Sequence, residues 1–248
     1  MAGNTLDMAT QSAPILVTRP LAEGQAFAQA LTARFGARLR PVLSPLLAPR
    51  DLTPLLPEGD YAAVVFTSAQ AVQAARPMAV RLPKLAWCVG RKTAEAATAA
   101  GFQSRSAEGD AEALVMAIAA APPSGSILYL RGVDTASNIL VKLRNIGLQA
   151  EEAIVYIQEP QALLPQALAL LQDPVDVIVP LFSPRTAQLF RAALPAETLA
   201  RLHIAAMSGN VAEGLGDLPH AALTIASHPD APAMLDAVET LLVRLPPP

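Results

Sequence analysis

The chain repeats one pattern, which begins as ILVTRP at residues 15–20 and recurs as ILYLRG at residues 127–132. Each copy opens with an apolar run typical of a buried parallel strand. A helical pattern follows and ends at Gly36 in the first copy and at Gly147 in the second, and an extended stretch comes next. We call this segment repeat A, and we expect it to form a strand, a helix and a second extended segment.

A second pattern, repeat B, follows each copy of repeat A. Its first part reads VVFTSAQA at residues 64–71 and VPLFSPRTA at residues 179–187. Its second part reads WCVGRKTA at residues 87–94 and AAMSGNVA at residues 205–212. The order A, B, A, B predicts two similar α/β domains, because each repeat is a supersecondary unit that needs a partner to bury its apolar face.

Short β-rich runs alternate with helical patterns along the chain, which favours doubly wound parallel sheets. The expected strands are Ile15–Thr18, Ala62–Thr67, Leu85–Val89, Ile127–Leu130, Ile154–Ile157, Val175–Phe182, His203–Met207 and Leu223–Ala226. The expected helices are Glu23–Phe35, Thr93–Ala100, Glu112–Ala120, Ile139–Ile146, Gln161–Leu171, Thr186–Ala193 and Pro232–Leu242. Proline-rich passages at residues 41–57 and 160–165 mark two crossings, which suits one domain inserted within another.

The amino-acid composition and net charge limit the classes of ligand that the protein is expected to bind. Hydrophobic residues make up 52% of the 248 residues, charged residues 16%, and the formal net charge is −3. A mildly acidic chain without a basic stripe is a poor candidate for binding nucleic acid. An anionic small molecule remains compatible, because backbone amides at helix N-termini bind anions without Lys or Arg.

Other function classes are disfavoured by what the sequence lacks. The single cysteine, Cys88, lies in an apolar run and is read as a buried small hydrophobe, and the three histidines lack metal-ligand spacing. No apolar stretch reaches the ~18 residues of a membrane span. Residues 1–13 are polar and are read as a disordered leader rather than a signal peptide, so we expect a cytoplasmic protein. No dinucleotide, Walker or nucleophile-elbow motif occurs, and we expect neither cofactor nor metal.

Small hydroxyl or glycine residues stand between strand and helix in both copies of repeat B. They are Ser68, Ser183, Ser208 and Gly90 with Thr93. Ligands of open α/β sheets bind just outside the carboxyl ends of the strands, where free amides favour negative charge. Taken singly, each hydroxyl is also an ordinary helix N-cap. Basic side chains at strand ends (Arg19, Arg91, Lys92, Arg131 and Arg185) indicate either a solvated surface or a distributed anion site.

The ordered set of motifs resembles the uroporphyrinogen-III synthase family. The motifs are LVTRP at 16–20, VFTSAQAV at 65–72, CVGRKTA at 88–94, LRG at 130–132, VY at 155–156 and FSPRTA at 182–187. The resemblance runs from about Ile15 to about Leu242. It implies two flavodoxin-like (Rossmann-like) parallel-sheet domains joined by a two-stranded ladder. The discontinuous outer domain would comprise residues 1–38 plus 161–248, the inserted inner domain residues 50–149, and the linker strands residues 39–49 and 150–160.

The resemblance also implies a substrate and a site. The substrate would be hydroxymethylbilane, a flexible linear tetrapyrrole polycarboxylate, bound by a monomeric protein. Tyr156, which on composition alone is read as a core residue, would be the catalytic proton donor. Substrate-binding positions carried over are Thr18, Arg19, Thr67, Ser68, Ala69, Gly90, Thr93, Arg131, Gly132, Ser183, Pro184, Arg185, Ser208, Gly209 and Asn210.

Three departures from the family pattern stand at Ala69-Gln70, in the stretch of residues 133–138, and at Val211. They leave room for a paralogue of reduced activity. A non-catalytic two-domain protein that closes on a small anion is the competing hypothesis, and a flavodoxin-like FMN protein is a third. Accelerated ring closure to the type III isomer would separate the first hypothesis from the second, and a yellow colour would reveal the third.

Overall fold

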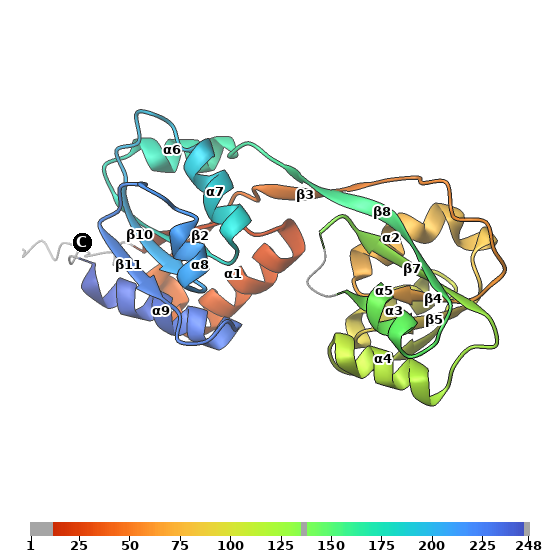
Figure 1. Cartoon of the computed structure of the whole chain (residues 1–248). Coiled ribbons are helices and arrows are strands. Elements are labelled where there is room, and N and C mark those ends of the chain that lie inside the picture. Colours follow the sequence, from red (N-terminus) through yellow and green to blue (C-terminus); the bar gives the residue numbers. More distant parts are fainter. Residues whose placement is uncertain (1–11, 135–137, 246–248) are drawn as a thin grey trace, which may run out of the picture. The chain divides into compact units, whose positions relative to one another are not determined.

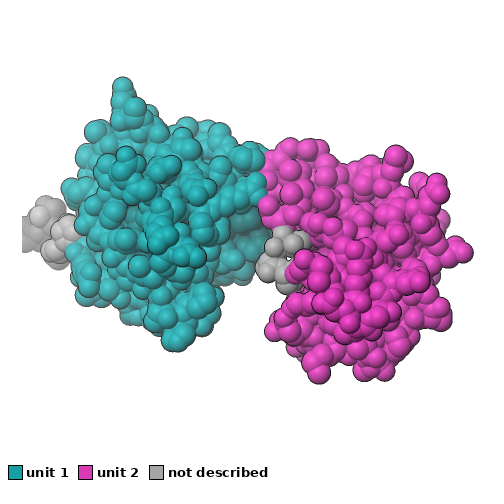
Figure 2. All heavy atoms as spheres, viewed as in Figure 1, with its two compact units in different colours: residues 1–48, 160–248 teal, residues 49–159 magenta. Residues whose placement is uncertain are grey.

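The computed structural model describes residues 12–134 and 138–245 (Figure 1). By its internal contacts the chain divides into two compact units, one of residues 1–48 with 160–248 and the other of residues 49–159 (Figure 2). We call them unit 1 and unit 2. Most of the expected leader, residues 1–11, lies outside the described residues, and the first strand begins at Ala13.

Unit 1 contains a five-stranded sheet in the order β11-β10-β9-β1-β2. All of its neighbouring strands are parallel. The sheet therefore combines strands of the first repeat A with strands of the second repeat B. The bounds are β1 (Ala13–Val17), β2 (Leu39–Leu43), β9 (Asp176–Leu181), β10 (Arg201–Ala206) and β11 (Ala222–Ile225).

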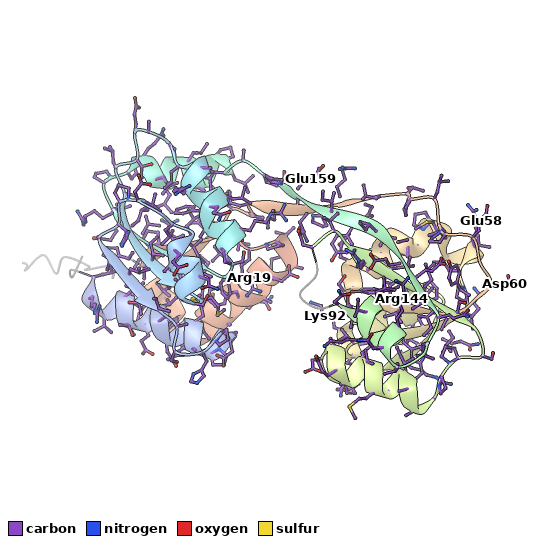
Figure 3. All side chains as sticks on the ribbon, viewed as in Figure 1. Arg19, Glu58, Asp60, Lys92, Arg144 and Glu159 are labelled. Carbon is purple, nitrogen blue, oxygen red and sulfur yellow. The ribbon has the colours of Figure 1, made fainter. Side chains whose placement is uncertain are left out.

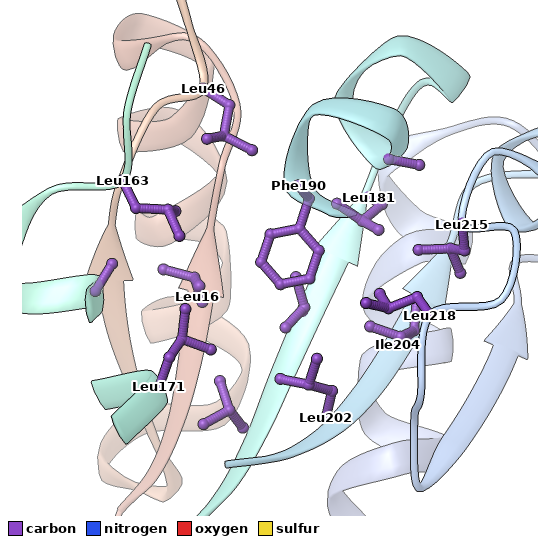
Figure 4. Packing of buried hydrophobic residues seen from close by; sticks show 14 of the residues in the cluster. Leu16, Leu46, Leu163, Leu171, Leu181, Phe190, Leu202, Ile204, Leu215 and Leu218 are labelled. Carbon is purple, nitrogen blue, oxygen red and sulfur yellow. The ribbon is translucent and has the colours of Figure 1, made fainter. Parts of the chain in front are cut away.

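Helices cover both faces of this sheet. Along β1, Ile15 and Val17 face a cluster built with α1 (Leu21–Phe35) and α9 (Ala231–Arg244). Leu16 faces the opposite cluster, where Phe190 is fully buried (Figure 4). Successive strand residues point to opposite faces, so an all-apolar strand packs on both sides. That second face carries α6 (Pro165–Gln172), α7 (Pro184–Ala193) and α8 (Gly209–Glu213).

Unit 2 contains a six-stranded sheet in the order β3-β8-β7-β4-β5-β6. The pairs among β4 to β8 are parallel. Here strands of the first repeat B are combined with strands of the second repeat A. The bounds are β3 (Leu47–Asp51), β4 (Tyr61–Phe66), β5 (Leu85–Cys88), β6 (Gln103–Ser106), β7 (Ser126–Gly132) and β8 (Ala150–Pro160).

The sheet of unit 2 also has two covered faces. Val64 and Phe66 of β4 pack on the side of α2 (Ala69–Ala75) and α3 (Arg91–Ala99). Ala63 and Val65 pack on the side of α4 (Ala111–Ala120) and α5 (Ile139–Asn145). Burying each Val or Phe side chain contributes about 1.5–3 kcal/mol. Two short 3₁₀ helices, Gly36–Arg38 and Arg76–Arg81, complete the described elements.

Two local differences from the expected elements have clear causes. Residues 39–49, expected as one linker strand, divide into β2 in the sheet of unit 1 and the separate strand β3. The chain turns between them at Ser44, whose amide donates to Val17 and whose hydroxyl accepts from Leu164. Helix α6 begins at Pro165 rather than at Gln161, because proline is pre-organised for the first helical position.

Candidate functional site

The expected site residues gather at the carboxyl edges of the two parallel sheets. In a parallel sheet all strands end at the same edge, so residues distant in sequence come together there. Unit 2 brings together residues that follow β4 and β5, the last residues of β7, and the residue of β8 opposite the end of β7: Thr67, Ser68, Ala69, Gly90, Thr93, Arg131, Gly132 and Tyr156. Unit 1 brings together Thr18, Arg19, Ser183, Pro184, Arg185, Ser208, Gly209 and Asn210 after β1, β9 and β10.

In unit 2, Tyr156 stands on β8 opposite Gly132, the last residue of β7. Its phenol oxygen lies 3.2 Å from the Ser68 hydroxyl. The same Ser68 hydroxyl accepts a hydrogen bond of 3.1 Å from the amide of Ala71 in the first turn of α2. The phenol is therefore held at the junction of β4 and α2, and it is partly exposed to solvent.

A second tyrosine, Tyr129, reaches the same edge from the other face of the sheet. Its hydroxyl lies 3.1 Å from the Thr67 hydroxyl, and burial raises its pKa. Sequence reasoning did not select Tyr129, although it lies in the ILYLRG motif. Its neighbours in the sequence are apolar, and with 2% exposure it is a core residue.

Arg131 is bound to groups of the protein itself. Its guanidinium donates two hydrogen bonds of 2.8 Å to the Glu152 carboxylate. It also donates to the carbonyls of Gly132 and Val133 at 2.9 and 3.1 Å. The hydrogen bond from Arg131 holds the pKa of Glu152 below its usual range. Arg131 thus fixes β7 to β8, and its charge is largely neutralised by a partner that sequence reasoning did not identify.

The start of α3 is open. A Cβ atom at Gly90 would meet nothing within 4 Å, and no side chain caps the helix there. The exposed Arg91 is paired with Glu108 at 3.0 Å, while Thr93 is buried. Lys92 lies in the first turn (Figure 3). The first amides of α3 are thus accessible to an anion.

Arg19 lies in unit 1 (Figure 3). Its guanidinium is placed over the ring of Phe182, 4.0 Å from the ring centroid. Phe182 in turn packs edge-on against Phe27 at 5.0 Å. Partial burial lowers the pKa of Arg19, although the nearby Glu23 opposes that effect. Among the described residues, no ion pair joins Arg19 to a carboxylate. Beside it, the buried hydroxyl of Thr18 has no hydrogen-bond partner within the described part of the chain.

The helices α7 and α8 of unit 1 differ in how their N-termini are capped. Ser183 caps α7 by accepting from the amide of Thr186 at 3.1 Å, and Pro184 supplies no N–H at the next position. Ser208 makes no side-chain cap, and a Cβ atom at Gly209 would meet nothing within 4 Å. Of these two starts, α8 is therefore the one with open amides, near Gly209 and Asn210. Arg185 lies in the first turn of α7.

The remaining positions are accounted for by packing or local contacts. Burial raises the pKa of Cys88 to about 12, which makes it inert as a nucleophile. Of the departures, Gln70 donates to Asp51 at 2.7 Å and Val211 is buried, while Ala136 and Ser137 lie outside the described residues. Within the described ranges, no group of three or more His, Cys, Asp or Glu could hold a metal ion. No described helix combines the length and apolarity that crossing a membrane requires.

Comparisons with known proteins identify the family of the chain. The family model described as uroporphyrinogen-III synthase HemD matches residues 25–236. A uroporphyrinogen-III synthetase from Helicobacter pylori is 18% identical with a TM-score of 0.60, and the match covers 93% of this chain and 99% of that one. A mutant uroporphyrinogen III synthase from Thermus thermophilus is 16% identical with a TM-score of 0.44, covering 94% and 100%. A search of curated proteins finds no match.

Proposed function

Because the chain belongs to the uroporphyrinogen-III synthase family, we propose that it cyclises hydroxymethylbilane to uroporphyrinogen III with inversion of ring D. The observation within the site that carries this proposal is the Tyr156 phenol held against Ser68 at the carboxyl edge of unit 2. The product serves tetrapyrrole biosynthesis. By reaction type the enzyme is a cyclising hydro-lyase, because one water leaves for each ring closed.

The proposed reaction begins at the hydroxymethyl group of ring A. Its hydroxyl departs as water once it has received a proton, and the ring becomes an electrophilic azafulvene in its protonated form. The substituted carbon of ring D attacks this centre and forms a spiro intermediate. One bond of that intermediate then breaks, and ring D recloses in the inverted orientation with loss of a proton, so that the net change is loss of one water.

Tyr156 is proposed to donate the proton to the departing hydroxyl. A phenol carries an O–H group that can donate a hydrogen bond. General acid catalysis of this kind contributes about 10²–10⁴-fold. Ser68 lies where its hydroxyl orients the phenol. The rest of the acceleration is assigned to holding the flexible substrate in one folded geometry.

The substrate carboxylates are proposed to bind at helix starts and at Arg19. The open amides near Gly90 and Gly209 support this assignment, as does the absence of a carboxylate partner for Arg19 among the described residues. Arg131 is proposed to act structurally, since Glu152 occupies its guanidinium. The remaining carried-over positions form the walls of these two edges. The chemistry requires neither metal nor cofactor, and a monomer suffices.

The proposed two-domain plan assigns residues 1–38 plus 161–248 to an outer domain and residues 50–149 to an inserted inner domain. The division of the chain into two compact units supports it. A flavodoxin-like fold is proposed for both. The strand order of unit 1, β2-β1-β9-β10-β11, corresponds to the flavodoxin order 2-1-3-4-5. In unit 2 the order β8-β7-β4-β5-β6 corresponds to a circular permutation of it.

One experiment tests the function. Hydroxymethylbilane is incubated with the protein, the products are oxidised to porphyrins, and the type I and type III isomers are separated. We expect accelerated loss of the bilane with type III as the main product, because spontaneous closure gives type I. Binding of the bilane with only the spontaneous rate and type I product would instead identify a binding protein.

A further inference from the structure

Strand β8 contains an irregularity directly beside Tyr156. Arg131 of β7 is paired with Ile154 of β8, but the next residue, Gly132, is paired with Tyr156. Val155 is therefore an extra residue on β8 that has no partner on β7. Such a β-bulge bends the strand and changes the direction of the side chain that follows it.

The bulge determines which face of the sheet Tyr156 occupies. Val155 is fully buried in the cluster formed with α2 and α3, and Tyr156 packs against that same cluster. In a regular strand, consecutive side chains point to opposite faces. If β8 continued regularly past Ile154, Val155 would pair with Gly132 and Tyr156 would lie on the opposite face of the sheet, far from Ser68.

Gly132 provides the space into which the Tyr156 ring is turned. A Cβ atom at Gly132 would lie 2.6 Å from Cζ of Tyr156 and 2.9 Å from its hydroxyl oxygen. These distances are well below van der Waals contact, so any side chain at this position would displace the ring. The ring lies between the Gly132 backbone and the Ser68 hydroxyl, which is 3.2 Å from the phenol oxygen.

We infer that Gly132 is a positioning residue for the Tyr156 phenol: its missing side chain and the bulge at Val155 together aim the phenol at the junction of β4 and α2. This inference rests on the proposed function, because it assigns a purpose to the placement of the catalytic tyrosine. It differs from the role that the family resemblance implies for Gly132, which is contact with substrate.

The test compares two glycines that each face a tyrosine ring. In Gly132→Ala the phenol is displaced, and we expect kcat to fall by up to ~10²-fold, as in Tyr156→Phe. The control is Gly59→Ala, where the new Cβ would lie 3.3 Å from Cζ of Tyr61 and 3.4 Å from its hydroxyl. That neighbour needs to shift only slightly, and we expect unchanged activity.

Two further readouts separate positioning from loss of structure. The three tyrosines are replaced with 3-fluorotyrosine, and the ¹⁹F resonance of Tyr156 is assigned by its loss in Tyr156→Phe. Gly132→Ala should move the Tyr156 resonance and leave the Tyr129 resonance in place. Combined with Tyr156→Phe, Gly132→Ala should lower kcat by less than about twofold more, because both changes remove the same interaction.

The outcomes distinguish this inference from the proposed function. If Tyr156→Phe is slow but Gly132→Ala keeps both kcat and the ¹⁹F resonance, the positioning role is wrong and the function stands. A moved resonance with full activity in both variants would support positioning but refute Tyr156 as the acid. If Gly132→Ala does not fold, Ser68→Ala replaces it. That variant should move the same resonance and lower kcat by up to about tenfold, and an unmoved resonance would overturn the inference.

Discussion

The carboxyl edges of the two sheets are each built from one copy of repeat A and one copy of repeat B, but they present different side chains. In unit 2, two phenols are paired with two hydroxyls, Tyr129 with Thr67 and Tyr156 with Ser68. The edge of unit 1 has no tyrosine, and there the Thr18 hydroxyl has no partner among the described residues. The two phenols are the reason for which proton transfer is proposed in unit 2, and the proposed anion binding in unit 1 rests on Arg19 and the open helix starts.

Equivalent arginines sharpen this comparison. Arg19 and Arg131 occupy the same place in the two copies of repeat A, ILVTRP and ILYLRG. Arg131 donates to Glu152 and to two carbonyls, whereas Arg19 lies over Phe182 and forms no ion pair with a carboxylate of the described residues. The next residue differs too. Gly132 admits the Tyr156 ring, and Pro20 stands at the same place in unit 1.

The largest effect is expected in unit 2, for Tyr156→Phe. The variant keeps the ring and its packing but loses the proton donor, so kcat should fall by up to ~10²-fold with little change in KM. Steady-state kinetics with hydroxymethylbilane measures both. The free energy of unfolding should change by no more than about 1 kcal/mol, since a single hydrogen bond is lost.

Isomer yield gives that prediction a second readout. A slowed enzyme lets spontaneous closure compete, so the type I share should rise at low enzyme concentration. The matched control is Tyr129→Phe, which removes the other phenol at the same edge and should retain pure type III product. Full rate and pure type III product from Tyr156→Phe would mean that Tyr156 only packs.

The next effect is expected in unit 1, for Arg19→Gln. Losing a charged donor to a carboxylate weakens binding by about 1.5–3 kcal/mol, so KM should rise roughly tenfold or more while kcat changes less. Arg34→Gln is the control, because Arg34, in the last turn of α1, is paired with Asp236 and Glu239. An unchanged KM for Arg19→Gln would refute an anion-binding role for this edge.

Much of the fold could be predicted from the sequence because repeats A and B each occur twice. Apolar runs such as residues 15–17 and 177–181 have no alternative to burial on both faces of a parallel sheet. Strand β6 (Gln103–Ser106) was missed because it is polar, half-exposed and at the edge of its sheet. The division of residues 39–51 into two strands depends on tertiary contacts of Ser44 that no local pattern reveals.

The candidate site followed only in part. Strand-end residues could be selected because a parallel sheet brings its ends to one edge, and the selected residues lie at these ends except Tyr156, which lies within β8 opposite the end of β7. The contacts of each side chain could not be predicted from the sequence. Glu152, which engages Arg131, is 21 residues distant, and the bulge that turns Tyr156 toward Ser68 depends on pairing between strands.

A smaller effect is expected for the serines that precede helices, whose replacement should lower the free energy of unfolding by different amounts. Ser68 and Ser183 each cap a helix amide, whereas Ser208 does not. Replacing a capping serine with alanine costs about 1 kcal/mol, so Ser183→Ala should lower the free energy of unfolding more than Ser208→Ala does. Urea denaturation measures this. Activity should stay within about tenfold for Ser183→Ala and Ser208→Ala because the backbone amides remain, and an indispensable hydroxyl at either position would refute binding by amides.

The smallest effect concerns acid stability and the contrast between the two arginines. The hydrogen bond from Arg131 lowers the pKa of Glu152, although partial burial opposes the shift. The unfolded chain, with a glutamate pKa of about 4.3, therefore takes up its proton first as the pH falls. The stabilisation is complete above about pH 4.3 and is lost as the pH drops through the lowered pKa of the folded state.

The free energy of unfolding of Glu152→Gln should consequently differ from that of the unmodified protein most at neutral pH and least in acid. Urea midpoints of both proteins across this range give the difference, and other acidic groups such as Asp176, whose pKa is also lowered, cancel in it. Arg19→Gln, which breaks no ion pair among the described residues, should show a difference that does not change with pH. If the stability difference for Glu152→Gln is also independent of pH, the ion pair does not neutralise Arg131. The proposal that anions bind in unit 1 rather than at Arg131 would then be unsupported.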